Sequence, residues 1–136
     1  MNHLRFFTLC FFVLISVKNN AQVTEQNYRI YSVKAAKEIA IAEITEDMKN
    51  ADVLFYGEEH NDSVTHYLEH KIFETLFQKY NSDIALSMEM FERDVQPIMN
   101  EYLTSDVREK NFKKDARVWS NYKDYRPMVE FSKLNK

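Results

Sequence analysis

The sequence predicts an α/β fold with a mostly parallel sheet, built from βαβ units with helices on its faces. Two short apolar runs, residues 53–56 and 84–88, are separated by a longer segment whose apolar residues recur at helical spacing. A strand, a helix and a second strand in this order form a βαβ unit, in which a right-handed crossover joins two parallel strands. Both runs end in polar residues, and ligands bind at this carboxyl edge of open α/β sheets.

The elements before the first strand are short. Residues 26–32 are rich in tyrosine and isoleucine and predict an edge strand. Residues 34–50 fit two patterns, because isoleucines alternate with alanines as in a strand, whereas the alanines and charges favour a helix. We expect a helix over at least residues 43–49.

The helix of the βαβ unit has a clear start. Asn61, Asp62 and Ser63 are candidate N-caps, and residues 64–80 place their apolar side chains on one face of a helix. Residues 81–83, Asn-Ser-Asp, predict the turn into the second strand.

The remaining elements are predicted to be helical. Asp94 can cap a helix that tolerates Pro97 in its first turn. Residues 105–117 are strongly charged and predict a surface helix or loop, and Pro127 opens a last helix over residues 128–134. Because only two or three sheet strands are predicted, we expect an incomplete, truncated domain.

The first 21 residues predict a signal peptide. Arg5 supplies a positive charge before the apolar run of residues 6–17, which is too short to span a bilayer comfortably. Ala21 offers a cleavage point, which leaves one domain over residues 22–136; an uncleaved N-terminal anchor is the alternative. We expect an exported protein.

Composition limits the possible partners of the mature chain. Cleavage removes Arg5, Lys18 and the only cysteine, Cys10, which leaves 16 basic against 21 acidic residues and a net charge of −5. A cysteine-free domain has neither disulfides nor thiolate ligands. The acidic balance argues against a nucleic-acid partner or an anionic membrane surface.

Glu58, His60 and Glu89 are predicted to share one rim of the sheet. The first strand runs into the only glycine, Gly57, followed by Glu-Glu-His, and the second ends in Glu89. A carboxylate and an imidazole together can bind a metal or act as an acid/base pair. The simpler alternative is a set of solvated charges at strand ends. For Glu89, between two methionines, burial costs free energy unless the carboxylate is paired or ligated.

Two further patterns carry candidate residues. His66, Glu69 and His70 match the H-x-x-E-H pattern of inverted zincins, but a third ligand would be needed and so short a pattern arises easily by chance. His70 fits a solvated helix face, whereas His66 near the helix start is the better site candidate. Residues 119–127 concentrate aromatic side chains, which fit either a core or the wall of a flat hydrophobic ligand.

Four blocks of the sequence, in this order and spacing, resemble the ChaN-like family of the Tiki superfamily. The blocks are Gly57–Asp62, His66, Glu89–Gln96, and Trp119 with Tyr122, Tyr125, Arg126 and Pro127. The resemblance runs from about Tyr28 to the end of the chain. It implies an exported haem-binding protein tied to iron acquisition, with an α/β fold. Characterised members of the family bind haem as a dimer with haem at the interface, and the resemblance implies the same arrangement here.

The resemblance also implies a set of haem-contacting residues. They are Glu58, His60, His66 and Glu89 on a polar rim, with Trp119, Tyr122 and Tyr125 on an apolar side. A tyrosine or a histidine is the expected axial ligand of the haem iron. The alternative is a metal-dependent hydrolase of the wider superfamily, in which His60 and Glu89 hold a divalent metal or activate a water.

The sequence departs from the family pattern in two respects. ChaN-type proteins can be lipoproteins, but Cys10 lies too early and lacks the small residues expected before a lipid-attachment cysteine. This departure weighs against attachment of a lipid at Cys10, and we expect a periplasmic or outer-membrane-associated protein. The family domain also continues for roughly another hundred residues, which supports the expectation of a truncated chain.

Overall fold

The computed structural model describes residues 23–81 and 83–135 of the chain, and most of the elements in it are helices. The predicted signal peptide lies outside the described residues. The α-helices are α1 (Ile41–Asp47), α2 (Ser63–Tyr80), α3 (Gln96–Leu103), α4 (Glu109–Asp115) and α5 (Tyr122–Leu134). Short 3-10 turns cover Glu25–Asn27, Met48–Asn50 and Arg93–Val95. The strands are β1 (Ile30–Ser32) and β2 (Lys37–Ile39).

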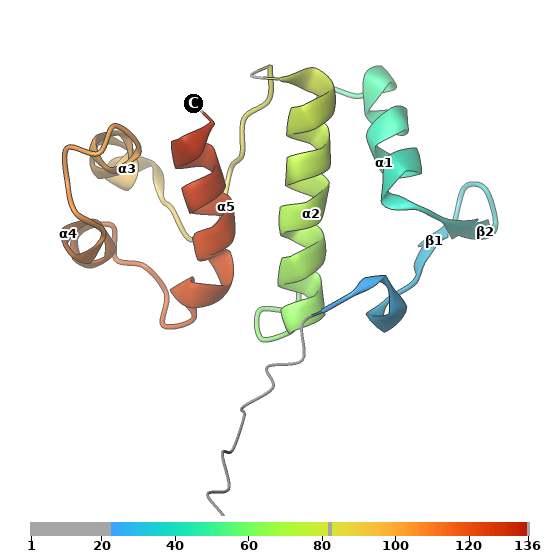
Figure 1. The fold of residues 1–136 in the computed structure, drawn as a ribbon, viewed down its shortest axis with the longest axis horizontal. Helices are drawn as coiled ribbons and strands as arrows, with labels where there is room; N and C mark the ends of the chain where they lie inside the picture. Colours follow the sequence, from blue (N-terminus) through green and yellow to red (C-terminus); the bar gives the residue numbers. More distant parts are fainter. Residues whose placement is uncertain (1–22, 82, 136) are drawn as a thin grey trace, which may run out of the picture.

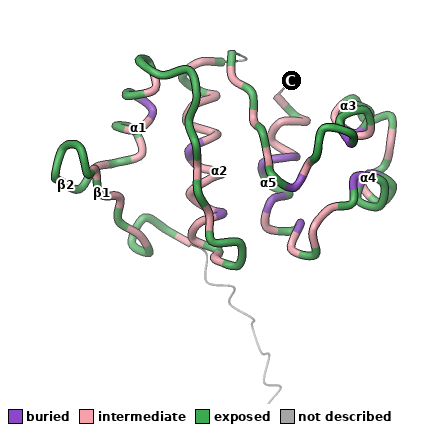
Figure 2. Tube along the Cα trace, turned by 180° about the vertical axis from the view of Figure 1, so that it is seen from behind, coloured by how far each residue is buried: buried purple, intermediate pink, exposed green. Residues whose placement is uncertain are grey.

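The predicted mostly parallel sheet is wrong. Within the described residues the only sheet is the antiparallel hairpin of β1 and β2, in which Ile30 pairs with Ile39. Residues 53–59 and 84–88 are extended, but neither run belongs to a β-ladder. The first run passes along α2, and the second passes between α2 and α5 (Figure 2). The prediction failed because an apolar run does not by itself fix a strand partner, and an isolated pair of strands is only marginally stable in water.

Helix α2 is the centre of the described structure and begins as predicted. The Asp62 carboxylate accepts hydrogen bonds from the Val64 amide at 2.9 Å and from the Thr65 hydroxyl at 3.1 Å. These bonds satisfy groups that a free helix N-terminus leaves unpaired. α2 contacts α1 on one side and α5 on the other (Figure 1).

Helix α5 begins at Tyr122 instead of Pro127, so the predicted start is wrong by about one and a half turns. Pro127 lies inside the helix, where it removes one backbone hydrogen bond. Tyr122, Tyr125, Met128 and Val129 are all buried on one stripe of the helix. Packing of this stripe therefore outweighs the unfavourable effect of the proline on the helix.

The main core lies among α3, α4, α5 and the chain before α3. Its buried members are Met90, Val95, Tyr102, Phe112, Ala116, Tyr122, Tyr125, Met128 and Val129. Residues 105–117 do contain the expected helix, but Phe112 within it is fully buried and stacks on the Tyr102 ring with centroids 4.3 Å apart. A single apolar residue thus anchors an otherwise charged helix.

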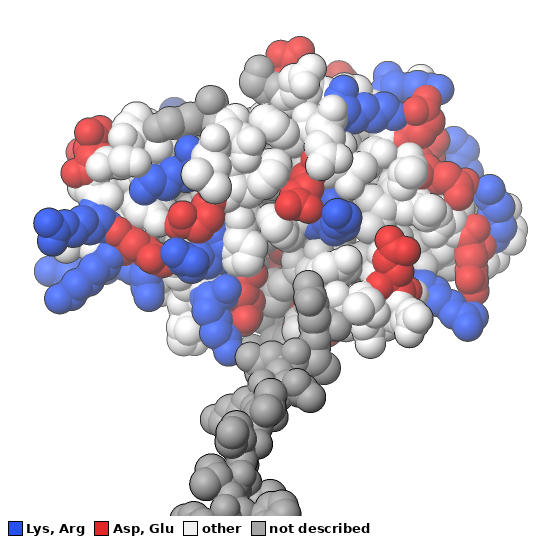
Figure 3. All heavy atoms as spheres, viewed as in Figure 1, with Lys and Arg blue, Asp and Glu red and all other residues white. Residues whose placement is uncertain are grey.

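The surface of the described residues carries an apolar run and mixed charges. Val53 and Phe55, expected in a buried strand, are 62% and 91% exposed; the segment is exposed along most of its length (Figure 2). Lysines and arginines alternate with acidic side chains over the face in Figure 3. No helix in the described part of the chain is long and apolar enough to cross a membrane.

Candidate functional site

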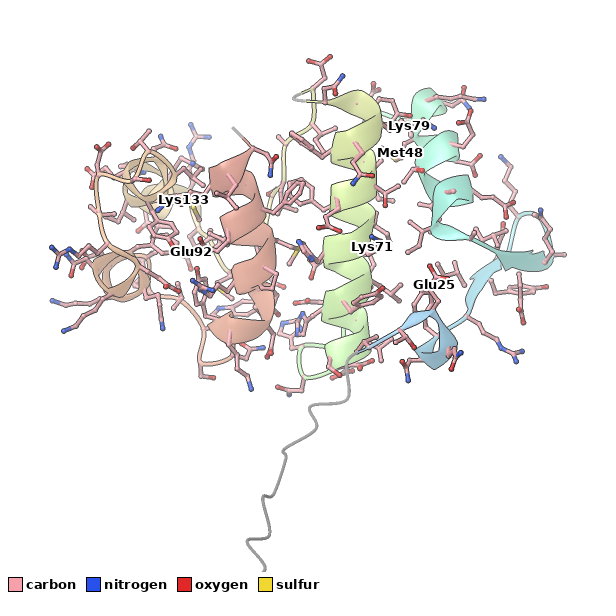
Figure 4. The ribbon with its side chains drawn as sticks, in the orientation of Figure 1. Glu25, Met48, Lys71, Lys79, Glu92 and Lys133 are labelled. Carbon is pink, nitrogen blue, oxygen red and sulfur yellow. The ribbon has the colours of Figure 1, made fainter. Side chains whose placement is uncertain are left out.

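The structure brings six of the seven predicted site residues into one cluster. They come from the segment before α2, the first turns of α2, the turn before α3, the loop before α5 and the first turn of α5. The six are Glu58, His60, His66, Glu89, Trp119 and Tyr125. Side chains of α2 and α5 meet in the space between the two helices (Figure 4).

His60 forms the exposed part of the cluster. Its imidazole stacks on the Trp119 indole, with ring centroids 5.0 Å apart and an interplanar angle of 18°. Nδ1 lies 3.5 Å from Oε1 of Glu58, and Nε2 lies 3.9 Å from Oε2 of Glu89. The His60 side chain is 49% exposed. One ring face is therefore covered by an aromatic side chain, while ring nitrogens remain reachable from solvent.

The turn that presents His60 lies after Gly57 and does not use its conformational freedom. Gly57 has no positive φ and no close neighbour around the position of a Cβ, so it is part of the extended segment. The chain turns at His60 and Asn61, where the Asp62 amide donates to the Glu59 carbonyl at 3.0 Å. The resulting loop still carries Glu58 and His60 to one place.

Glu58 connects the outer and inner parts of the cluster. Its Oε1 accepts a hydrogen bond of 2.5 Å from the Tyr125 hydroxyl, and its Oε2 lies 3.3 Å from Nδ1 of His66. Burial, followed by the hydrogen bond to Glu58, raises the pKa of Tyr125. The Tyr125 hydroxyl therefore keeps its proton at neutral pH and acts as the donor.

His66 forms the buried part of the cluster, with only 5% of its side chain exposed. Its Nε2 lies 3.0 Å from the backbone carbonyl oxygen of His60. Because a carbonyl oxygen only accepts, Nε2 carries a proton, so that in the neutral tautomer Nδ1 presents a lone pair. That lone pair faces Glu58 and Glu69, whose Oε2 lies 3.8 Å away.

Two residues of this site, Glu69 and Asn121, were not among the predicted haem- or metal-binding residues. Burial, and then repulsion from Glu58, raises the pKa of Glu69 to about 7. The signal for Glu69 was its spacing of three residues from His66, which puts both on one helix face. Asn121 donates from Nδ2 to the His60 carbonyl at 2.8 Å and helps to fix the loop; nothing in the sequence indicated this contact.

His70 and Tyr122 lie outside the cluster. His70 faces Glu74, with Nε2 and Oε1 3.7 Å apart, so the two histidines of the zincin-like pattern do not converge on one group. Tyr122 packs its ring at 6.1 Å from the ring of Phe112 in the main core. Its buried hydroxyl has no hydrogen-bond partner among the described residues.

Glu89 is close to His60 but is not buried as its apolar neighbours suggested. Its side chain is 78% exposed, which favours the solvated alternative for this carboxylate. His60 and Glu89 together supply two metal ligands, whereas catalytic zinc sites hold the metal with three protein ligands. The pair therefore fits a surface imidazole with a flexible acidic neighbour better than a closed metal site.

Comparisons with known proteins agree with the resemblance. Residues 44–136 match the family model described as "Haem-binding uptake, Tiki superfamily, ChaN". No curated protein and no solved structure matches the chain. The match covers more than half of the sequence and includes every residue of the cluster. The chain therefore belongs to the ChaN haem-binding uptake family of the Tiki superfamily.

Proposed function

We propose that this protein is exported, binds haem through His60 and acts in haem or iron uptake. The observation that carries the proposal is the half-exposed His60 imidazole, held against an aromatic wall in a member of a haem-binding family. Neutral imidazole is a common axial ligand of haem iron.

Burial separates His60 from the other expected axial ligands. Tyr122 and Tyr125 are each 3% exposed, and His66 is also buried. Burial raises the pKa of both tyrosines, which disfavours the phenolate that would bind iron. A planar haem can approach His60 without displacing core side chains, whereas it cannot reach the other three.

The surroundings of His60 favour an imidazole that presents Nε2 outward. Nδ1 lies beside the Glu58 carboxylate, and histidines that bind metals commonly direct their second ring nitrogen at such an acceptor. The Trp119 indole limits rotation of the ring and offers apolar surface to the macrocycle. Glu89 beyond Nε2 is exposed and free to move aside.

The structure also contains an apolar groove, which fits haem ligation less well. The groove encloses about 500 Å³ between α2, α3, α5 and residues 84–91, and Phe73, Met88 and Phe131 are in its wall. Its described lining contains no histidine or tyrosine. We therefore favour the His60 rim over the groove.

Export and assembly are part of the same proposal. The positively charged and apolar start of the sequence supports a signal peptide over residues 1–21, with residues 22–136 as the haem-binding domain in the periplasm or at the outer membrane. His60 would hold the haem from one copy of the chain, which leaves room for residues of a second copy to contact the same haem. We propose a homodimer with haem at the interface, as the resemblance to the family implies.

A haem titration of the purified protein tests the proposal. We expect a saturable shift of the Soret band that is lost in His60→Ala. His70→Ala is the matched control, because His70 lies on α2 and pairs with Glu74 outside the cluster. An unchanged Soret shift in His60→Ala, or its loss in His70→Ala, would contradict ligation by His60.

A further inference from the structure

We propose that Glu58, His66 and Glu69 form a binding site for a divalent transition-metal ion, separate from the haem-binding imidazole of His60. One ligand atom from each residue, Oε2 of Glu58, Nδ1 of His66 and Oε2 of Glu69, lies within 4.8 Å of the other two. The site is enclosed by the start of α2, α5 and the segment that follows Gly57.

The three ligand atoms are buried and lack hydrogen-bond partners. Within the described part of the chain, each of these atoms is shielded from solvent and makes no hydrogen bond. Buried polar atoms are nearly always paired, and leaving one unpaired costs about 1–3 kcal/mol. Three such atoms facing one another therefore indicate a missing partner that all three share.

The chemistry of the three atoms indicates that the missing partner is a cation. Nε2 of His66 donates to the His60 carbonyl, so Nδ1 presents a lone pair toward two carboxylate oxygens at 3.3 and 3.8 Å. Lone pairs at these separations repel one another unless positive charge lies between them. A second proton on the ring, at Nδ1, stabilises this arrangement less well than a cation, because it would not form a hydrogen bond to either carboxylate in this geometry.

The hydrogen bond on the far side of His66 matches a feature of metal-binding histidines. Such residues usually donate their other ring N–H to a carboxylate or a backbone carbonyl, which fixes the tautomer and the ring orientation. The His60 carbonyl has this role here, and it is held in turn by Asn121. The ring is therefore fixed before any ion binds.

The donor set selects the class of metal. One imidazole nitrogen and two carboxylate oxygens suit Zn²⁺ and its first-row neighbours, whereas Mg²⁺ and Ca²⁺ prefer oxygen ligands alone. Three protein ligands leave a fourth position open. The alternative occupant is a proton shared by Glu58 and Glu69, and this alternative predicts no affinity for metal.

Calorimetric titration of the chelator-treated full chain with Zn²⁺, and visible spectra with Co²⁺, test the site. We expect one Zn²⁺ per chain, d–d absorption of bound Co²⁺, and little heat with Mg²⁺. Glu69→Gln keeps the shape of the side chain and should weaken Zn²⁺ binding at least ~10-fold. Glu74→Gln, on the same helix but facing His70 and Lys71, should bind Zn²⁺ as the unaltered chain does.

A second measurement uses the unaltered chain, so it does not depend on whether a variant folds. In the ¹⁵N-labelled chain, Zn²⁺ should shift the imidazole signals of His66 and leave those of His70 unchanged. Absence of stoichiometric Zn²⁺ binding would overturn the proposal in favour of the shared proton. Unchanged affinity in Glu69→Gln, or a shift at His70 alone, would also overturn it, because the ion would then be bound elsewhere. Loss of haem binding in His60→Ala bears only on the proposed function.

Discussion

The Tyr125 hydroxyl donates a 2.5 Å hydrogen bond to the Glu58 carboxylate and so ties α5 to a segment 67 residues earlier in the chain. Glu58 is only 13% exposed, so this bond is one of the few interactions that stabilise its buried charge. The same carboxylate faces His60 and His66. The contact therefore supports both the fold and the geometry of the site.

Tyr125→Phe should destabilise the protein by about 1.5–3 kcal/mol, the usual range for a hydrogen bond to a charged group. The phenylalanine ring keeps the edge contacts of Tyr125 with His66 and Trp119, so the loss comes from the hydroxyl alone. Urea unfolding followed by circular dichroism measures the change in the free energy of unfolding.

Tyr122→Phe is the matched control for this experiment. Tyr122 is as buried as Tyr125, but its hydroxyl has no hydrogen-bond partner among the described residues. Removing it should change the free energy of unfolding by no more than about 0.5 kcal/mol, or stabilise the protein. Equal losses in the two variants would show that the bond to Glu58 contributes nothing specific.

Trp119→Ala should weaken haem binding without abolishing it. The indole supplies stacking and apolar surface, and an aromatic contact of this kind contributes about 0.5–1.5 kcal/mol beyond its buried area. We expect haem affinity to fall about two- to tenfold, with the spectrum of histidine ligation retained. Trp119→Phe, which keeps an aromatic ring beside His60, should retain most of the affinity.

A haem titration followed at the Soret band measures both Trp119 variants. If Trp119→Phe loses as much haem affinity as Trp119→Ala, an aromatic ring stacked on His60 does not account for the contribution of Trp119 to haem binding. If either variant loses the spectrum of histidine ligation, Trp119 has a larger role than a wall beside the imidazole.

Local signals in the sequence predicted local structure well. The run of polar residues before position 64 and the one-faced apolar spacing after it predicted α2, which spans Ser63–Tyr80 with Asp62 as its cap. Capping and periodicity act over a few residues, so they can be read without knowing the rest of the fold. The cluster of Glu58, His60 and Glu89 also forms, because the segments carrying them converge.

The sheet could not be predicted in the same way. An apolar run such as residues 53–56 fits a buried strand, but strand pairing depends on what lies beside it in space. Here no ladder forms, and the run is largely exposed. Glu69 was left out of the predicted site for a related reason: the zincin-like pattern grouped it with His66 and His70, whereas Glu58, which lies in the same cluster, comes from another segment.

Phe112→Ala should be among the most destabilising substitutions in the described chain. Phe112 is fully buried, stacks on Tyr102 and contacts Phe91 and Tyr122. Truncating a buried phenylalanine costs about 3–5 kcal/mol through lost transfer free energy and the cavity that remains. Thermal and urea unfolding measure the loss.

Phe55→Ala is the control for Phe112→Ala. Phe55 is almost fully exposed, so its removal should change the free energy of unfolding by no more than about 0.5 kcal/mol. A loss of several kcal/mol in Phe55→Ala would mean that other groups cover this side chain in solution.

Glu46 pairs with two lysines, and one of them, Lys79, links α1 to α2. Its carboxylate lies 2.7 Å from Nζ of Lys49 and 2.5 Å from Nζ of Lys79, which reaches α1 from the last turn of α2 (Figure 4). Hydrogen bonds from Lys49 and then from Lys79 lower the pKa of Glu46 from 4.5 to about 2. Both lysines thus favour the charged form of the carboxylate in the folded state.

Glu46→Gln should destabilise the protein in a pH-dependent way. Because the pKa of Glu46 is lower in the folded than in the unfolded state, its contribution to stability is fully present above 4.5 and is lost as the pH falls toward 2. The difference in urea midpoint between the unaltered chain and Glu46→Gln should therefore be constant near neutral pH and should shrink across that acidic window. Glu25→Gln, at an exposed position for which no ion pair is found in the described chain, should show no such trend. A difference for Glu46→Gln that does not change with pH would mean that the two lysines do not stabilise the charged carboxylate.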